Sequence, residues 1–181
     1  MTKVIAISGA SGAGKKSVVK ALSDYFSCPS LYFDDHVDGN SYPTNMKAWF
    51  ENGAHLSEIN TPTMAASLRD LLAQQPDYIV VEEPFGRERQ SIASMISHVV
   101  LLDTPLEICL CRVIKRNLCR NSVDGLNSVQ SYLSQYEDHL RDIYIETVNQ
   151  VRSRSDMIVS EIQPVSACAD AITNWLKINV N

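Results

Sequence analysis

Short runs of hydrophobic residues recur along the chain and are separated by longer segments with a different pattern. Within the runs the hydrophobic residues are mostly consecutive rather than alternating, which is typical of strands covered on both faces in a parallel sheet. The runs span residues 3–8, 30–35, 77–83, 98–103 and 156–160. We therefore predict five buried parallel strands.

Between the runs, hydrophobic residues return every three or four positions, as they do in amphipathic helices. The segments with this pattern span residues 15–27, 63–75, 105–120, 129–151 and 165–178. The pattern in 129–151 continues without a break, so we predict one long helix there. Alternating strands and helices indicate a doubly wound α/β fold.

The length of 181 residues fits one domain, and no repeat or linker divides residues 1–181. The least regular segment, residues 36–62, holds Trp49 and Phe50 among Gly, Pro and Asn residues. This composition predicts an ordered insertion on the substrate side of the fold.

The net charge of −5 argues against binding to nucleic acid or to an anionic membrane. No apolar stretch approaches the length of a membrane span, and an odd set of five cysteines indicates reduced thiols. Cys109 and Cys111 would point about 200° apart on a helix, so we interpret the cysteines as small buried hydrophobic residues rather than a metal site. These features predict a soluble, cytoplasmic protein, either a monomer or a homodimer.

The segment "GASGAGKKS" (9–17) lies between the first strand and the first helix. Gly, four residues, Gly and Lys is the spacing of a phosphate-binding P-loop, and its strand–loop–helix context supports that interpretation. The residues expected to bind the nucleotide are Gly9, Ala10, Ser11, Gly12, Ala13, Gly14, Lys15, Lys16 and Ser17. The motif requires a Ser or Thr hydroxyl for Mg²⁺ directly after the Lys, but here Lys16 has that place and the hydroxyl follows on Ser17.

Acidic residues follow two of the predicted strands. Asp34 and Asp35 end the second run, and Glu82 follows the third. Ligands of open α/β sheets lie at the carboxyl ends of the strands, so Asp34 and Asp35 are candidates to orient an acceptor hydroxyl, accept its proton or hold metal through water. Glu82 is our candidate for the metal, together with Ser17. The alternative for the aspartates is a simple turn, where Asp is common. Candidate contacts to the substrate are Asp34, Asp35, His36, Tyr42 and Arg87.

Arg112, Arg116 and Arg120 are spaced by four and therefore form one stripe on the predicted helix. Such a stripe suits a lid, here residues 112–128, whose arginines stabilise a transferring phosphate. The alternative is a solvated face paired with acids such as Glu107. We favour the lid and place Arg112 and Arg116 with Lys15 and Asp34 among the catalytic residues.

Together these motifs resemble the uridine kinase and nicotinamide riboside kinase branch of the small P-loop kinases. The resemblance is carried by "YFDD" (32–35), "VVEEPF" (80–85), "LLDTPLEICLCRVIKRN" (101–117) and "SDMIV" (155–159). It implies Asp34 as the candidate base, and a three-layer P-loop fold with a helical lid and a five-stranded parallel sheet of order 2-3-1-4-5. It also implies transfer of phosphate from ATP, with Mg²⁺, to a hydroxyl of a small molecule, with a nucleoside or a similar compound as the favoured acceptor.

The chain departs from this family at Lys16 and at Glu83, where Gly is usual, and Asn117 stands where the lid has Asp. Two hypotheses follow from Lys16. The first is an active kinase with a rearranged metal site and weakened activity. The second is a nucleotide-binding pseudokinase that acts as a regulatory or partner-binding module, and a Lys16 introduced into an ordinary kinase is a further possibility.

Overall fold

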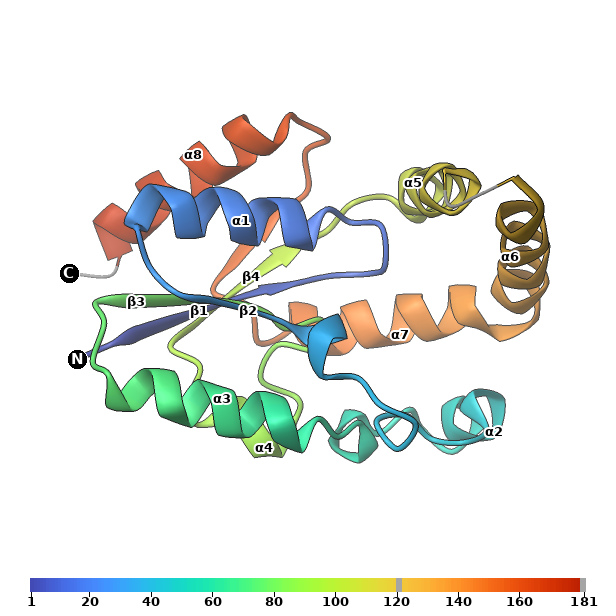
Figure 1. Ribbon diagram of the computed structural model, residues 1–181, viewed down its shortest axis with the longest axis horizontal. Coiled ribbons are helices and arrows are strands. Elements are labelled where there is room, and N and C mark those ends of the chain that lie inside the picture. Colours follow the sequence, from blue (N-terminus) through green and yellow to red (C-terminus); the bar gives the residue numbers. More distant parts are fainter. Residues whose placement is uncertain (120–121, 180–181) are drawn as a thin grey trace.

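Five parallel strands form the central sheet of the computed structural model, which describes residues 1–119 and 122–179 (Figure 1). Their order across the sheet is β2-β3-β1-β4-β5, so the predicted topology is confirmed. The strands are β1 (Lys3–Ser8), β2 (Ser30–Tyr32), β3 (Tyr78–Glu82), β4 (His98–Leu102) and β5 (Met157–Val159). This arrangement places β1, and the loop that follows it, at the centre of the sheet.

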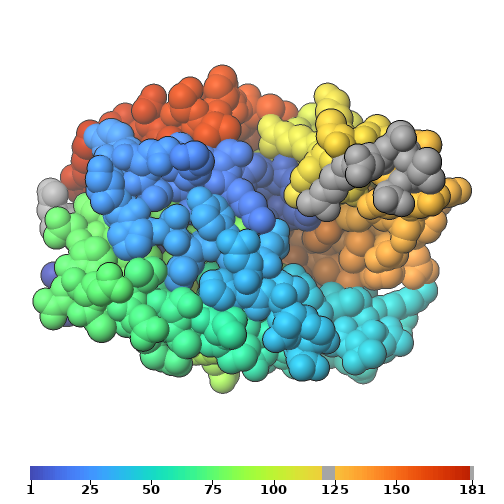
Figure 2. Space-filling model, in the orientation of Figure 1, coloured from blue at the N-terminus to red at the C-terminus, as the bar shows by residue number. Residues whose placement is uncertain are grey.

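Helices cover both faces of the sheet and give the expected three layers (Figure 1). One face is covered by α1 (Lys15–Phe26) and α8 (Val165–Asn179), and the other by α3 (Pro62–Ala73), α4 (Gln90–Ala93) and α7 (Arg141–Arg152). Beyond the carboxyl ends of the strands lie α2 (Met46–Glu51), α5 (Leu106–Leu118) and α6 (Ser122–Gln135). In Figure 2, α1 in dark blue lies between α8 in red and the paler blue of the following segment.

Alternate residues of β1 face opposite halves of the core. Val4 and Ala6 pack on the side of α3, whereas Ile5 and Ile7 pack on the side of α1, and all four are fully buried. Burial on both faces explains why the strand sequences are continuous hydrophobic runs, as parallel sheets require.

The second strand is shorter than predicted. It ends at Tyr32, and residues Phe33–His36 form the short 3₁₀ helix η1, which carries Asp34 and Asp35. Phe33 is buried against the α3 side of the core, and the two aspartates favour a turn over a strand. The prediction that both aspartates lie on the strand end is therefore wrong in detail, although η1 follows β2 directly.

The predicted single helix over 129–151 is also wrong. The chain forms α6, then a π-helical turn η3 (Tyr136–Leu140), then α7, and the helix axis changes direction at this turn (Figure 1). π turns are a recognised cause of such bends. Tyr136 stacks loosely between Tyr132 and Tyr144 at the bend, with ring centroids 6.0 Å and 6.3 Å apart.

The 36–62 segment is ordered by its own contacts. It contains α2 and a short 3₁₀ helix η2 (Leu56–Glu58), and its side chains Trp49, Leu56 and Ile59 are buried. The indole nitrogen of Trp49 donates a hydrogen bond to the His55 carbonyl oxygen at 3.2 Å.

The interpretation of the cysteines as small buried residues is correct only in part. Cys109 and Cys168 are buried, but Cys111 and Cys119 are exposed, because they lie on the outer face and at the end of α5. No group of three or more acidic, His or Cys side chains within 1–119 and 122–179 could hold a metal ion. In the same residues, every helix is too short or too polar to cross a membrane.

Candidate active site

At two positions the backbone of the P-loop has a conformation that only glycine can adopt. Gly9 has φ +136° and Gly12 has φ +89°. A Cβ atom on Gly9 would lie 2.6 Å from the carbonyl oxygen of Leu102, and one on Gly12 would lie 2.3 Å from that of Cys109. Both the conformation and the space therefore require glycine here. The loop delivers the chain into the first turn of α1, where free N–H groups and the helix dipole favour anions.

Lys15, the first residue of α1, points back over the loop. Its ammonium donates a hydrogen bond to the Ala10 carbonyl oxygen at 3.0 Å and lies 3.9 Å from Oε1 of Glu82. Burial lowers the pKa of Lys15, and the charges of Glu82 and Asp34 oppose that shift. The side chain is thus held in place where a phosphate chain would lie on the loop.

Glu82, the last residue of β3, is only 4% exposed. Burial raises the pKa of its carboxyl group, while the neighbouring Lys15 lowers it. Its second oxygen, Oε2, is buried and has no hydrogen-bond partner within residues 1–119 and 122–179. A buried acceptor without a partner is costly, so this oxygen is suited to accept from a ligand such as metal-bound water.

Lys16 and Asp34 form an ion pair across the cleft. Nζ of Lys16 lies 2.9 Å from Oδ2 of Asp34, which joins the start of α1 to η1. Partial burial lowers the pKa of Lys16, but the hydrogen bond and the charge of Asp34 outweigh it, so the net shift is upward. The residue that replaces the usual hydroxyl therefore contacts the candidate base.

Lid arginines reach the same loop from α5. Nη1 of Arg112 donates hydrogen bonds to the carbonyl oxygens of Gly12 at 3.3 Å and Ala13 at 3.2 Å. Arg116, one turn later, also faces the cleft. The predicted third member of the stripe, Arg120, lies outside the described residues, as does part of the predicted 112–128 lid.

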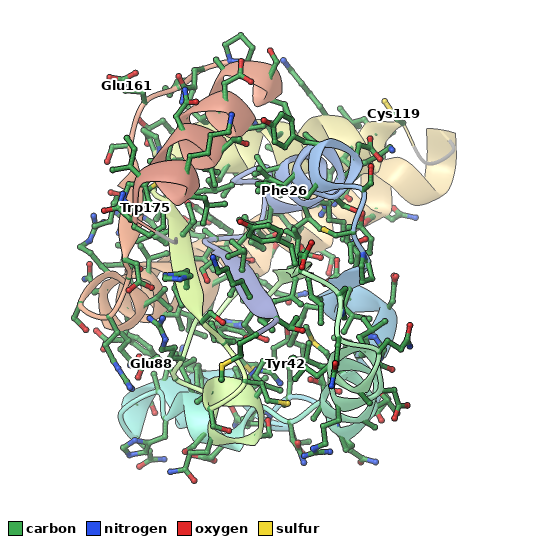
Figure 3. The ribbon with its side chains drawn as sticks, turned by 90° about the vertical axis from the view of Figure 1, so that its left-hand side faces the viewer. Phe26, Tyr42, Glu88, Cys119, Glu161 and Trp175 are labelled. Carbon is green, nitrogen blue, oxygen red and sulfur yellow. The ribbon has the colours of Figure 1, made fainter. Side chains whose placement is uncertain are left out.

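A cleft of about 490 Å³ contains most of the predicted site residues. The predicted residues that line it are Gly9, Ala10, Ser11, Gly12, Gly14, Lys15, Lys16, Ser17, Asp34, Tyr42, Glu82, Arg112 and Arg116. Its volume falls within the usual range for small-molecule sites. Tyr42, which Figure 3 labels on the side of the sheet away from Trp175, brings the 36–62 segment to the cleft.

Six further residues line the cleft and were not predicted. They are Phe33, Pro84, Phe85, Val113, Tyr144 and Thr147. Tyr144 and Thr147 lie three apart on α7, and their sequence spacing is the same as that of core positions. Only their polar groups, within an otherwise apolar stripe, could have indicated a cleft.

Three predicted substrate contacts are not brought into the cleft. Asp35 is exposed on η1, and Nδ1 of His36 lies 3.2 Å from the Thr63 hydroxyl at the start of α3. The prediction for Arg87 is wrong, because its guanidinium is bound at the amino ends of the strands. There it donates to Asp156 at 2.8 Å and to the Ser97 carbonyl oxygen at 2.6 Å.

A second cavity of about 330 Å³ adjoins the P-loop on its α8 side. Ala13, Gly14 and Ser17 form one wall, and Arg112 also borders it. The opposite wall is the loop between β5 and α8, which includes Glu161, labelled in Figure 3. Arg112 and the P-loop thus lie between the two cavities and contribute to the lining of both.

The five-stranded parallel sheet of order 2-3-1-4-5, flanked by helices on both faces, matches the fold of P-loop kinases. Solved structures share this fold over nearly the whole chain. Shikimate kinase from Aquifex aeolicus has a TM-score of 0.57 and 18% identity, covering 97% of each chain. A sugar kinase from a Janibacter species has a TM-score of 0.62 and 15% identity, covering 99% of this chain and 96% of the other.

In sequence the chain is similar to uridine kinases. That of Lactiplantibacillus plantarum is 24% identical and covers 96% of this chain and 94% of its own length. That of Streptococcus pyogenes is 22% identical, with 87% of this chain and 86% of its own length covered. No model of a known protein family matches the chain.

Proposed function

We propose that this chain transfers the terminal phosphoryl group of ATP to a hydroxyl group of a small molecule. One observation carries the proposal: the Asp34 carboxylate lines the same cleft as the P-loop lysines and the two α5 arginines, and it pairs with Lys16 at 2.9 Å. A phosphate loop alone would indicate nucleotide binding, whereas an added carboxylate supplies a base for an acceptor.

The two cavities suggest how donor and acceptor divide the site. The donor's phosphates would lie on the P-loop, with its base in the 330 Å³ cavity between Arg112 and the loop before α8. The acceptor would then occupy the 490 Å³ cleft, where Tyr42 and Tyr144 offer aromatic surfaces and the buried Phe33 and Phe85 complete the lining. Rings of this kind suit a flat or ring-shaped acceptor, so a nucleoside or nucleoside-like compound is our proposed substrate class. The similarity to uridine kinases supports the same class.

In the proposed reaction Asp34 accepts the proton of the acceptor hydroxyl. The hydroxyl oxygen bonds to the terminal phosphorus, the bond from that phosphorus to its bridging oxygen breaks, and ADP leaves with the electron pair. Lys15, Arg112 and Arg116 stabilise the negative charge spread over the phosphate oxygens. The 36–62 segment and the lid would exclude water while this occurs.

The residues fit Mg²⁺ only in part. Glu82 fits, because its buried Oε2 can accept from metal-bound water, and Ser17 offers a hydroxyl at the cleft. Position 16 does not fit, because an ammonium group cannot ligate a cation. When bound, Mg²⁺ would shield the charge of the phosphate oxygens, with Glu82 and Ser17 as the residues that hold it.

The second candidate function is nucleotide binding without transfer. The Lys16–Asp34 ion pair favours it, because a base engaged by an ammonium group is less available to an acceptor. Under this alternative the chain would act as a regulatory or partner-binding module.

Asp34→Asn and Asp35→Asn test the proposal as a matched pair. ADP formation is measured against a panel of nucleosides, sugars and other hydroxyl compounds. We expect Asp34→Asn to slow transfer by about 10²–10⁴-fold at nearly unchanged nucleotide affinity, because only the base is lost. Asp35→Asn, at an exposed position on the same helix, should stay within about 3-fold of wild type. Nucleotide binding with no transfer to any compound would favour the second candidate.

A further inference from the structure

The side chain of Lys16 is placed differently from an ordinary surface lysine. Lys20, on the same helix, is 70% exposed and pairs with Asp24 four residues later, as neighbours on a helix surface commonly do. Lys16 instead reaches from α1 to η1 and pairs with Asp34 at 2.9 Å. Both partners line the cleft, so this ion pair spans the site itself.

The charges that surround Lys16 are those that would otherwise receive a divalent cation. Lys16 pairs with the Asp34 carboxylate at 2.9 Å, and the Glu82 carboxylate lines the same cleft. The ammonium group therefore neutralises part of this acidic side of the cleft. A metal ion at the same place would be repelled by a fixed positive charge and would compete for Asp34.

A triphosphate on the P-loop would meet an unusual set of cations. Lys15 and Arg112 contact the loop directly, and Lys16 begins one residue beyond Lys15, at the end of α1 that favours anions. An ammonium is a compact charge with three donors, so it can bind a phosphate oxygen and a carboxylate together. This is the bridging task that a metal ion performs between phosphate and protein.

We propose that the Lys16 ammonium takes the place of Mg²⁺ between the nucleotide phosphates and Asp34, so that this chain binds ATP without a divalent metal. The inference rests on the proposed function, since it assigns a role at the same nucleotide site. It assigns Lys16 to nucleotide binding and leaves Asp34 as the base.

Calorimetric titration of ATP tests this, with each protein measured in excess EDTA and in excess Mg²⁺. The wild-type dissociation constants in the two conditions should agree within about 3-fold. Lys16→Thr restores a hydroxyl and removes the charge, so its affinity in EDTA should fall at least about 10-fold below its affinity in Mg²⁺. Lys16→Arg keeps the charge and should retain binding in EDTA, and Lys16→Met should bind weakly in both conditions.

Lys20→Thr is the matched control, since it removes a paired lysine from the same helix away from the cleft. It should behave as wild type in both conditions. A wild-type protein that binds ATP only in Mg²⁺ would overturn the inference while leaving the proposed function intact. A wild-type protein that binds ATP in neither condition would overturn both.

Discussion

Two neighbouring carboxylates at the end of β3 lie on opposite faces of the sheet and have very different contacts. Glu82 faces the P-loop side, where it has Lys15 at 3.9 Å and one oxygen without a partner among the described residues. Glu83 faces the α3 side, where Arg89 donates to both of its oxygens and is itself fully buried. The alternation of side chains along a strand is enough to separate them.

The difference distinguishes a carboxylate that is used by the fold from one that is left for a ligand. Arg89 also donates to the Thr61 hydroxyl at 2.6 Å and lies over the Phe33 ring, 5.0 Å from its centroid. This network fixes η1 and the start of α3 beneath the cleft. Among residues 1–119 and 122–179, Glu82 has no comparable set of donors. Its free oxygen is therefore available to accept a hydrogen bond at the nucleotide site.

Breaking the buried ion pair between Arg89 and Glu83 should have the largest effect on stability. Arg89→Met leaves Glu83 as a buried, unpaired charge, which should lower the free energy of unfolding by about 3–5 kcal/mol. Thermal or urea unfolding measures this directly. In the double variant Arg89→Met, Glu83→Leu both charges are gone, and most of the loss should be recovered. An Arg89→Met protein as stable as wild type would contradict the assigned network.

Changing Glu82, on the P-loop side of the sheet, should affect activity rather than folding. Glu82→Gln removes the acceptor that would serve metal-bound water during transfer, a step separate from the metal-free ATP binding assigned to Lys16, and we expect ADP formation in Mg²⁺ to fall by about 10–100-fold. Its unfolding midpoint should stay close to that of wild type. Glu83→Gln is the matched control and should show the reverse, a loss of stability that accounts for any loss of activity. If Glu82→Gln and Glu83→Gln changed the unfolding midpoint equally, the two carboxylates would not differ in their importance for the fold.

Arg87 and Arg89 extend the comparison to two arginines of one loop. Arg87 is bound to Asp156 and to two carbonyl oxygens at the amino ends of the strands. Because its side chain is partly exposed, Arg87→Met should cost only about 1–2 kcal/mol in unfolding free energy. The Michaelis constants for both substrates should be unchanged. If only the Michaelis constant for the acceptor rose, Arg87 would be a substrate contact after all.

The pH dependence of stability should show the smallest effect. Burial raises the folded-state pKa of Glu82, so the folded protein binds this proton more tightly than the unfolded chain does. The wild type should therefore lose stability relative to Glu82→Gln as pH rises from about 4.5 through that pKa. Urea unfolding of both proteins from pH 4 to pH 7 gives the difference. A difference that does not change with pH would exclude a raised pKa.

The strands and the glycine loop could be predicted from the sequence because they depend on local patterns, whereas the strand order came from the resemblance to a known family. A buried parallel strand needs a continuous hydrophobic run, and the loop needs its glycines at fixed spacing. The site was less predictable where the outcome depended on distant partners. Arg89 could not be recognised as buried, because its burial depends on Glu83 and Thr61 in space rather than in sequence.

The same reasoning explains the errors in the long helix and on the acceptor side. Hydrophobic periodicity in 129–151 fits a straight helix and a bent one equally, so the π turn at Tyr136–Leu140 left no signal. Tyr144 and Thr147 followed the core spacing and were not recognised as lining the cleft. Arg87 follows a strand-end motif, but its guanidinium donates to Ser97 and Asp156 at the amino ends of β4 and β5.

The absence of a side chain at Gly12 has a mechanical consequence. A Cβ there would meet the Cys109 backbone, and Arg112 is bonded to the carbonyl oxygens of the same loop. The first half of α5 is therefore packed on the phosphate loop and hydrogen-bonded to it. In the proposed kinase, a closing movement of the lid would carry the loop with it or begin on the carboxyl side of Arg112, which would couple donor binding to lid closure.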